Sequence, residues 1–171
     1  SAPCKSDWDR LKKLARYLES HPRMIMKYEY QKPVDRLNII VDTDYAGCRR
    51  TRRSTNGGLA MLGNHIVKSW ATTQTVIALS SGEAEYYGVT KGACEGLGMV
   101  GLIEDMLNFR YKIELSTDSS AAKGISTRKG VGKVEHLETR TLRVQDQVEK
   151  GRIKMKKNDG RYNPADLTPK D

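Results

Sequence analysis

The sequence predicts an α/β domain whose mixed sheet is flanked by helices. The chain has 171 residues, enough for one compact domain with a core and with little room for a second. Short apolar segments separated by turn residues, a pattern typical of an antiparallel meander, occupy its middle part. Helix and strand patterns then alternate to the C-terminus, and this order implies a mixed sheet with helices packed on it.

A helix and two strands are expected in the N-terminal part. Ser6 is a good N-cap, and apolar residues recur at helical spacing to about Ser20. His21-Pro22 ends this helix, because the residue before a proline disfavours helical geometry. The two strands are expected over Met24–Tyr30 and Leu37–Asp42.

Three short strands and a long helix are expected next. The strands cover Gly58–Leu62, Ile66–Ala71 and Thr75–Leu79, with turn residues between the first two. The helix extends from about Ser81 to Leu107. Apolar side chains three or four residues apart are expected to form its buried stripe: Tyr86, Val89, Ala93, Leu97, Val100, Ile103 and Leu107.

The long helix is unusually rich in glycine. Each interior glycine costs roughly 1 kcal/mol of helix propensity relative to alanine. Gly88, Gly92 and Gly96 are four residues apart, so they would form one smooth face that another backbone or a substrate could approach closely. The alternative is that the helix is weak or broken at these positions.

The C-terminal part alternates between strands and helices. A strand is expected over Ile113–Thr117 and a short helix over Ser119–Ile125. A longer helix follows from Glu135 to about Val148, and then a strand over Arg152–Met155. Pro164 opens a short helical segment near the end of the chain.

The composition is basic. Thirty lysines and arginines against 21 acidic residues give a net charge of +9 and an isoelectric point near 9.5. Such a balance is compatible with a polyanionic partner, because neutralised phosphates release condensed counterions. Each basic cluster could equally be a solvated loop. The clusters are Arg49, Arg50, Arg52 and Arg53; Lys123, Arg128, Lys129 and Lys133; and Lys154, Lys156, Lys157 and Arg161.

The sequence predicts an intracellular protein, cytoplasmic or nuclear. No apolar run approaches the roughly 18 to 20 residues of a membrane helix, and the first residues form an amphipathic pattern rather than a signal peptide. Cys4, Cys48 and Cys94 are far apart and lack zinc spacing, so reduced thiols are expected. The chain does not begin with Met, and we expect it to be either a trimmed chain or a piece cut from a longer polyprotein.

Four acidic residues lie at the boundaries of predicted elements. Asp42 follows an apolar strand, and Asp118 closes another strand before a helix. Glu85 lies in the first turns of the long helix, and Asp166 lies in the last helical turn of the chain. Functional groups of open α/β sheets gather at strand ends and at the helix starts that follow them. Four carboxylates there would repel one another unless cations lay among them.

Two neighbouring acids compete for the same roles. Ser80-Ser81-Gly82-Glu83 has the pattern of a capping box, in which Glu83 reaches back to Ser80. Glu83 and Glu85 lie about 200° apart around a helix, so only one can face the sheet edge, and capping leaves Glu85 for chemistry. Asp44 shares the strand parity of Asp42 and stays a candidate. Any one of these acids could also be an exposed surface charge.

The chemistry that these acids predict is metal-dependent phosphodiester hydrolysis. Hard oxygen ligands favour Mg²⁺ or Mn²⁺ over zinc. Two such ions roughly 4 Å apart can hold a phosphodiester, one activating a water and the other stabilising the leaving oxygen. No nucleophilic side chain is then needed, which agrees with a chain that has only three histidines and no Ser/His/Asp or Cys/His pattern.

Seven blocks of residues follow one another between residues 8 and 170. The most specific is Ala78-Leu79-Ser80-Ser81-Gly82-Glu83-Ala84-Glu85-Tyr86. The others are Val41-Asp42-Thr43-Asp44-Tyr45-Ala46-Gly47-Cys48; Thr51-Arg52-Arg53-Ser54-Thr55-Asn56-Gly57; Val67-Lys68-Ser69-Trp70; Thr117-Asp118-Ser119-Ser120-Ala121; His136-Leu137-Glu138-x-Arg140; and Asn163-Pro164-Ala165-Asp166. Together they resemble the ribonuclease H domain of copia-type LTR retrotransposons.

The resemblance implies a ribonuclease H-like fold with a five-stranded mixed sheet. It implies a hydrolase that cuts the RNA strand of an RNA–DNA hybrid internally, leaving 5′-phosphate and 3′-hydroxyl ends. The family's catalytic metal ligands fall on Asp42, Glu85, Asp118 and Asp166, which favours Asp42 over Asp44. Two Mg²⁺ ions are the implied cofactor, and Mn²⁺ could substitute for them.

The resemblance also suggests a partner and a division of the chain. The first helix resembles the segment that connects reverse transcriptase to ribonuclease H in such polyproteins. We therefore separate residues 1–35, a connection-like helix and strand, from residues 36–171, the ribonuclease H-like domain. The reverse transcriptase domain of the same polyprotein is an expected partner, beside the hybrid itself.

Substrate contacts are predicted beside the metal ligands. RNA is distinguished from DNA by its 2′-hydroxyls, which small polar groups can read, and basic loops can hold phosphates without reading sequence. His136 is a further candidate for touching substrate or metal. The predicted hydroxyl contacts are Ser54, Thr55, Ser81 and Ser119, and the predicted phosphate contacts are Arg52, Arg53 and Lys123.

Two other readings compete with a ribonuclease. The first is a non-catalytic remnant of such a domain that binds nucleic acid or protein. The second is another enzyme of the same fold, such as an integrase or junction resolvase, which would act on DNA duplexes.

Overall fold

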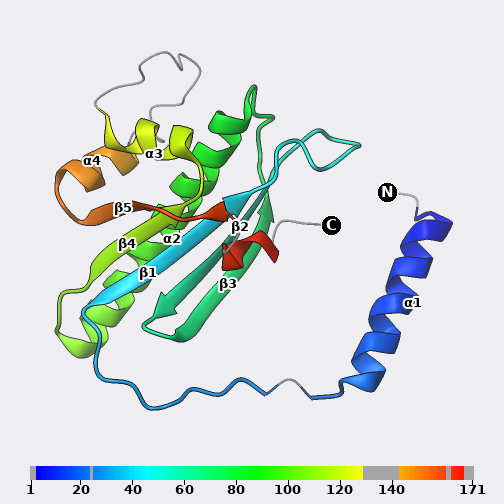
Figure 1. The fold of residues 1–171 in the computed structure, drawn as a ribbon, viewed down its shortest axis with the longest axis horizontal. Helices are drawn as coiled ribbons and strands as arrows, with labels where there is room; N and C mark the ends of the chain where they lie inside the picture. The colour runs from blue at the N-terminus through cyan, green and yellow to red at the C-terminus, as the bar shows by residue number, and fades with distance from the viewer. Residues whose placement is uncertain (1–2, 24, 129–142, 161–162, 168–171) are drawn as a thin grey trace. The chain divides into compact units, whose positions relative to one another are not determined.

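The computed structural model describes residues 3–23, 25–128, 143–160 and 163–167 (Figure 1). Contacts divide the chain into two compact units, Ser1–Tyr30 and Gln31–Asp171. Compact units are not the same as independently folding domains, so the predicted boundary after residue 35 stays a prediction. Among the described residues no helix combines the length and the apolarity that a membrane span requires.

The first unit consists of helix α1, Lys5–Ser20, and the segment that follows it. Its N-cap is Cys4 rather than the predicted Ser6, because the Cys4 amide donates to the Asp7 carboxylate at 2.9 Å. The strand predicted over Met24–Tyr30 is wrong, since the described residues 25–30 form no strand. Those residues have no neighbouring strand to complete their backbone hydrogen bonds within the unit.

The second unit contains the five-stranded mixed sheet that the resemblance implied. Its strands are β1 (Arg36–Thr43), β2 (Thr55–Leu62), β3 (His65–Thr73), β4 (Lys112–Thr117) and β5 (Ile153–Lys157). They lie in the order β3-β2-β1-β4-β5. β2 is antiparallel to β1 and β3, whereas β4 is parallel to β1 and β5. The carboxyl ends of three parallel strands therefore meet at one edge of the sheet.

The third strand of the predicted meander, Thr75–Leu79, is not a strand. The chain leaves the sheet at Gln74, whose side-chain amide donates to the Asn56 side chain at 2.6 Å and to the Ala84 carbonyl at 2.9 Å. These buried bonds draw the segment toward the following helix. A β-rich composition over Thr75–Leu79 was therefore a misleading signal, because local propensity yields to tertiary contacts.

Helices cover one face of this sheet. They are α2 (Ser81–Leu107), α3 (Ser120–Thr127) and α4 (Arg143–Glu149). In Figure 1 α2 passes behind the strands, and the short 3₁₀ helix η3 (Pro164–Leu167, red) lies in front of them and packs against β1 and β2. The bounds of α2 agree with prediction. Of the helix predicted from Glu135, residues 135–142 lie outside the described residues.

The glycine face of α2 lies directly on β1. A Cβ at Gly92 would lie 2.5 Å from Cγ1 of Val41, and one at Gly96 would lie 3.0 Å from Cγ1 of Ile39. The helix is unbroken there, so the close approach expected from the glycine spacing is made by the sheet.

The buried stripe of α2 ends sooner than predicted. Residues such as Tyr86, Val89 and Val100 are buried, but Leu107 is 60% exposed. Because α2 runs antiparallel to β1 from Thr43 toward Leu37, its last turn extends past the start of that strand.

Gly92→Ala is expected to destabilise the protein by about 1–3 kcal/mol, because the new methyl group would overlap Val41. Gly98→Ala is the matched control: no atom lies within 4 Å of its added carbon, so it should stabilise by up to about 1 kcal/mol through helix propensity. Urea unfolding measures both. Equal effects of the two substitutions would contradict the close packing of α2 on β1.

Candidate metal centre

Three of the four predicted acids come together at the carboxyl edge of the sheet. Asp42 lies near the end of β1, Asp118 directly follows β4, and Glu85 lies in the second turn of α2. One carboxylate oxygen of each lies within 4.8 Å of the others. The parallel pairing of β1 with β4 brings the two aspartates to the same edge, and the contact of α2 with β1 adds the glutamate.

The environment of this cluster opposes its full ionisation. Asp42 is 8% exposed, and Oε2 of Glu85 is buried without a hydrogen-bond partner. Burial first, and then the charges of Asp118 and Asp42, raise the pKa of Glu85 to about 8.

The cluster fits a divalent cation. Its donors are carboxylate oxygens, the ligands that Mg²⁺ and Mn²⁺ prefer. The unpartnered Oε2 of Glu85 is free to bind an ion, and a cation would offset the repulsion among the three carboxylates.

The fourth predicted ligand, Asp166, lies on η3. This short helix packs against β1 and β2, so the backbone of Asp166 is held on the strand that bears Asp42. The side chain of Asp166 lies outside the described atoms, and its role as a ligand stays a prediction.

Asp44 has a structural role in the loop between β1 and β2. Its carboxylate accepts a hydrogen bond from the amide of Thr55, and its own amide donates to the Thr55 carbonyl at 3.2 Å. The carboxylate also fills the space beside Gly47. Asp44 thus holds the start of the loop and is not among the three clustered carboxylates.

Glu83 belongs to the cap of α2. Oγ of Ser80 accepts a hydrogen bond from the Glu83 amide at 3.2 Å, as predicted. The Glu83 carboxylate accepts from the amide of Leu79 at 2.8 Å, one residue before the predicted partner, and from the Tyr87 hydroxyl at 3.2 Å. With Glu83 engaged in this way, Glu85 is the acid of the helix that faces the aspartates.

The predicted substrate contacts have different surroundings. Arg52 and Arg53 are exposed in the loop between β1 and β2, and Ser81 is exposed at the start of α2. Ser54 is buried, and its hydroxyl accepts a hydrogen bond from the Ala46 amide at 3.0 Å. The half-buried Thr55 donates its amide to Asp44.

The remaining predicted contacts are on or near α3. Ser119 is its N-cap, with a hydroxyl that accepts from the Ala122 amide at 3.1 Å. Lys123 is half-buried on the helix, and His136 lies outside the described residues. All these substrate roles stay predictions.

Two residues close to the cluster were missed by sequence reasoning. A Cβ at Gly160 would lie 2.9 Å from Oδ2 of Asp118, so the backbone of Gly160 lies against that carboxylate. Asn163 is buried, and its side-chain amide donates to the Val41 carbonyl at 3.3 Å. The turn residues Asn158-Asp159-Gly160 gave a signal for a turn but none for its place beside Asp118.

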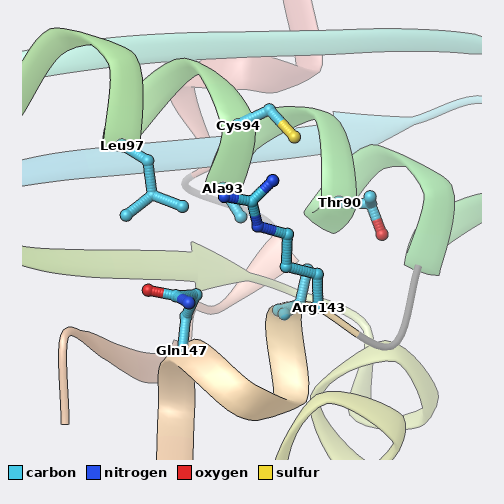
Figure 2. A pocket seen from close by; sticks show the side chains of 7 residues that line it. Thr90, Ala93, Cys94, Leu97, Arg143 and Gln147 are labelled. Carbon is cyan, nitrogen blue, oxygen red and sulfur yellow. The ribbon is translucent and has the colours of Figure 1, made fainter. Parts of the chain in front are cut away.

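Cavities lie elsewhere on the second unit. One of about 220 Å³ opens between α2 and α4, where Arg143 reaches toward α2 above the buried Gln147 (Figure 2). Another of about 270 Å³ is lined by residues that include Asn56, Gln74 and Tyr87. Neither of these two cavities is lined by a clustered carboxylate.

This sheet order, with helices on one face and clustered carboxylates at its edge, defines a ribonuclease H-like fold. Ribonuclease H1 LC11, isolated from compost by a metagenomic approach, matches with a TM-score of 0.53 and 17% identity, over 79% of this chain and 93% of its own. The N-terminal ribonuclease H domain of a Mycobacterium tuberculosis protein matches with a TM-score of 0.52 and 14% identity, over 80% and 91%. These likenesses establish the fold.

The chain also has relatives in sequence. A retrovirus-related Pol polyprotein from transposon TNT 1-94 of Nicotiana tabacum is 24% identical over 169 residues, 98% of this chain and 13% of its own. An uncharacterized mitochondrial protein of Arabidopsis thaliana is 36% identical over 95 residues, which are 54% of this chain and 38% of that protein. Secreted RxLR effector protein 161 of Plasmopara viticola is 33% identical over 97 residues, which are 57% of this chain and 68% of that protein.

The chain is related in sequence to a retrotransposon Pol polyprotein and shares the fold of ribonuclease H domains, in agreement with the predicted resemblance. It spans 38% of the Arabidopsis protein and 13% of the tobacco polyprotein, so it corresponds to one part of such a protein. No model of a known protein family matches it.

Without divalent metal, the protein is expected to lose stability as the pH rises toward 8. The pKa of Glu85 is raised to about 8 in the folded chain, so its contribution is complete below about pH 4.5 and is lost as the pH passes 8. Glu85→Gln stays neutral and should lack this loss. Thermal unfolding in a chelator at pH 5.5 and 8 measures the difference.

The matched control for that measurement is Asp105→Asn, which removes an exposed carboxylate of the same helix. It should keep the pH dependence of the unsubstituted chain. Added Mn²⁺ should restore stability at pH 8 to the unsubstituted chain more than to Glu85→Gln, because a ligand that binds the folded state stabilises it. The same pH dependence in all three proteins would contradict the raised pKa of Glu85.

Proposed function

We propose that this chain is the ribonuclease H domain of a copia-type LTR retrotransposon and hydrolyses the RNA strand of an RNA–DNA hybrid. The observation that carries the proposal is the group of Asp42, Glu85 and Asp118 at the carboxyl edge of a ribonuclease H-like sheet. Two solved proteins that share the fold are named as ribonucleases H, and the tobacco relative is named as a Pol polyprotein.

The carboxylates have a defined role in this proposal. Asp42, Glu85 and Asp118, with Asp166 as the fourth acid, would hold Mg²⁺ or Mn²⁺. When bound, two such ions supply Lewis-acid activation of a water and stabilisation of the leaving oxygen of the phosphodiester. The protein contributes ligands held in place by strand ends and a packed helix, which limits their reorganisation during the reaction.

Surrounding groups would select and hold the substrate. The hydroxyls of Ser81 and Ser119 are suited to reading 2′-hydroxyls across the minor groove of an A-like duplex. Arg52 and Arg53 are exposed on the loop that follows β1 and would contact phosphates. We also propose that residues 1–35 connect the domain to a reverse transcriptase domain, and that the protein acts in the cytoplasm or nucleus.

Cleavage of a labelled RNA–DNA hybrid in Mg²⁺ and in Mn²⁺ tests the function. The unsubstituted chain should cut the RNA strand only. Asp42→Asn and Asp118→Asn should each lower the rate by about 10²-fold or more, because each removes a ligand of the reacting centre. Asp105→Asn, on an exposed turn of α2, should retain the rate.

Other outcomes of this experiment identify the rival functions. Hybrid binding without cleavage in either metal, unchanged by both aspartate substitutions, would indicate a non-catalytic binding remnant. Cleavage of a DNA duplex would indicate an enzyme of the integrase or resolvase class.

The double substitution Arg52→Glu and Arg53→Glu is expected to weaken hybrid binding. It should also reduce the slope of log affinity against log salt concentration by the amount that roughly two phosphate contacts contribute. Arg110→Glu is the control, because Arg110 is exposed beyond the far end of α2. Affinities measured at several salt concentrations separate the two. An unchanged salt slope in the loop variant would remove these arginines from the substrate-binding set.

A further inference from the structure

The chain that follows β5 crosses the edge of the sheet where the carboxylates lie. The amide of Asn158 donates to the carbonyl of Thr117 at 2.9 Å, which holds this chain against the end of β4. Gly160 then lies against the carboxylate of Asp118. Asn163 then bonds to Val41 of β1, directly before η3 begins at Pro164. This connection, described over residues 158–160 and at 163, therefore contacts two of the strands that carry metal-binding acids.

Asn163 joins β1 to η3 through one side chain. It is 6% exposed, so the hydrogen bonds of its amide group are shielded from water. Nδ2 donates to the Val41 carbonyl at 3.3 Å, and Oδ1 accepts from the amide of Ala165 at 3.1 Å. Val41 immediately precedes Asp42, and Ala165 immediately precedes Asp166. The side chain thus links the backbone beside one acid to the backbone beside another, across 122 residues of sequence.

Asn163 contacts β1 at the point where the pairing of β1 with β4 ends. The pairing of β1 with β4 ends at Ile40 and Ser116, one residue before Val41. The ladder between the two strands ends at that pair, and the carbonyl of the buried Val41 accepts a hydrogen bond from the Asn163 side chain. A fully buried Ala165 seats the first turn of η3 beside it. Both contacts restrict where η3, and hence Asp166, can lie.

We infer that Asn163 is a positioning residue of the metal centre, one that holds Asp166 at the distance from Asp42 that shared metal binding requires. This inference rests on the proposed function, because Asp166 is a ligand only there. Residues that orient metal ligands without touching the ion commonly contribute 10- to 100-fold to metal affinity. A side chain that only fills space would contribute to folding alone.

Titration of the full chain with Mn²⁺ tests the inference, with bound metal followed by calorimetry or by the electron paramagnetic resonance of free Mn²⁺. Asn163→Ala should weaken Mn²⁺ binding by about 10- to 100-fold. In an Asp166→Asn background the same substitution should have little further effect, because the ligand that it positions is gone. Asn64→Ala, in the exposed turn between β2 and β3, should leave the affinity unchanged.

Asn163→Ser covers the case in which the alanine variant does not fold. A serine hydroxyl can still accept the local hydrogen bond from Ala165, but it is too short to replace the bond to Val41. Thermal unfolding without metal reports the folding of each variant. Weakened Mn²⁺ binding in a folded serine variant, lost in the Asp166→Asn background, supports the inference.

Two results would overturn it, and they differ from a failure of the proposed function. Equal weakening in both backgrounds would mean that Asn163 acts through the fold and not through Asp166. Unchanged Mn²⁺ affinity in the Asn163 variants, with binding lost in Asp42→Asn, would overturn this inference but leave the metal centre intact. Binding that Asp42→Asn leaves unchanged would instead contradict the centre itself.

Discussion

The close contact between α2 and β1 is the constraint on which the rest of the protein depends. Val41 and Ile39 project into positions on the helix where a methyl group would not fit, so the helix axis lies nearer the sheet than larger side chains permit. That proximity brings Glu85 to the end of β1, where it can meet Asp42. The glycines that permit this close approach lower the helix propensity of α2. The same contact therefore organises both the core and the candidate metal centre.

The candidate centre is an arrangement that the fold alone does not favour. Three carboxylates in one partly buried cluster repel one another, and burial, together with that repulsion, raises the pKa of Glu85. Hydrogen bonds of neighbouring residues hold the segments that carry these carboxylates. Asp44 and Glu83, the two neighbouring acids, are both occupied with backbone amides. Glu85, whose Oε2 is buried without a hydrogen-bond partner, faces the two aspartates at the sheet edge, where a cation can offset the repulsion.

The sequence predicted what local pattern and boundary position encode. Asp42, Glu85 and Asp118 could be selected because each lies at the end or start of an element, and the five sheet strands other than their exact ends followed from apolar patterning. Thr75–Leu79 failed because buried bonds of Gln74 outweigh strand propensity. The roles of Gly160 and Asn163 could not be predicted, since they arise from contacts between residues far apart in the sequence.

Among the described strands β3 and β5 are the outermost, and an outermost strand is a hazard for a sheet protein. An unpaired edge can accept a strand from another molecule and so begin aggregation. β5 is short and carries Lys154, Lys156 and Lys157 along its five residues. β3 carries Lys68, held at 2.6 Å by Glu95 of α2, and its pairing with β2 is interrupted by a bulge at Ala60 and Met61. Lysines on both outer strands, and the bulge beside one of them, are features that disfavour edge-to-edge pairing of sheets.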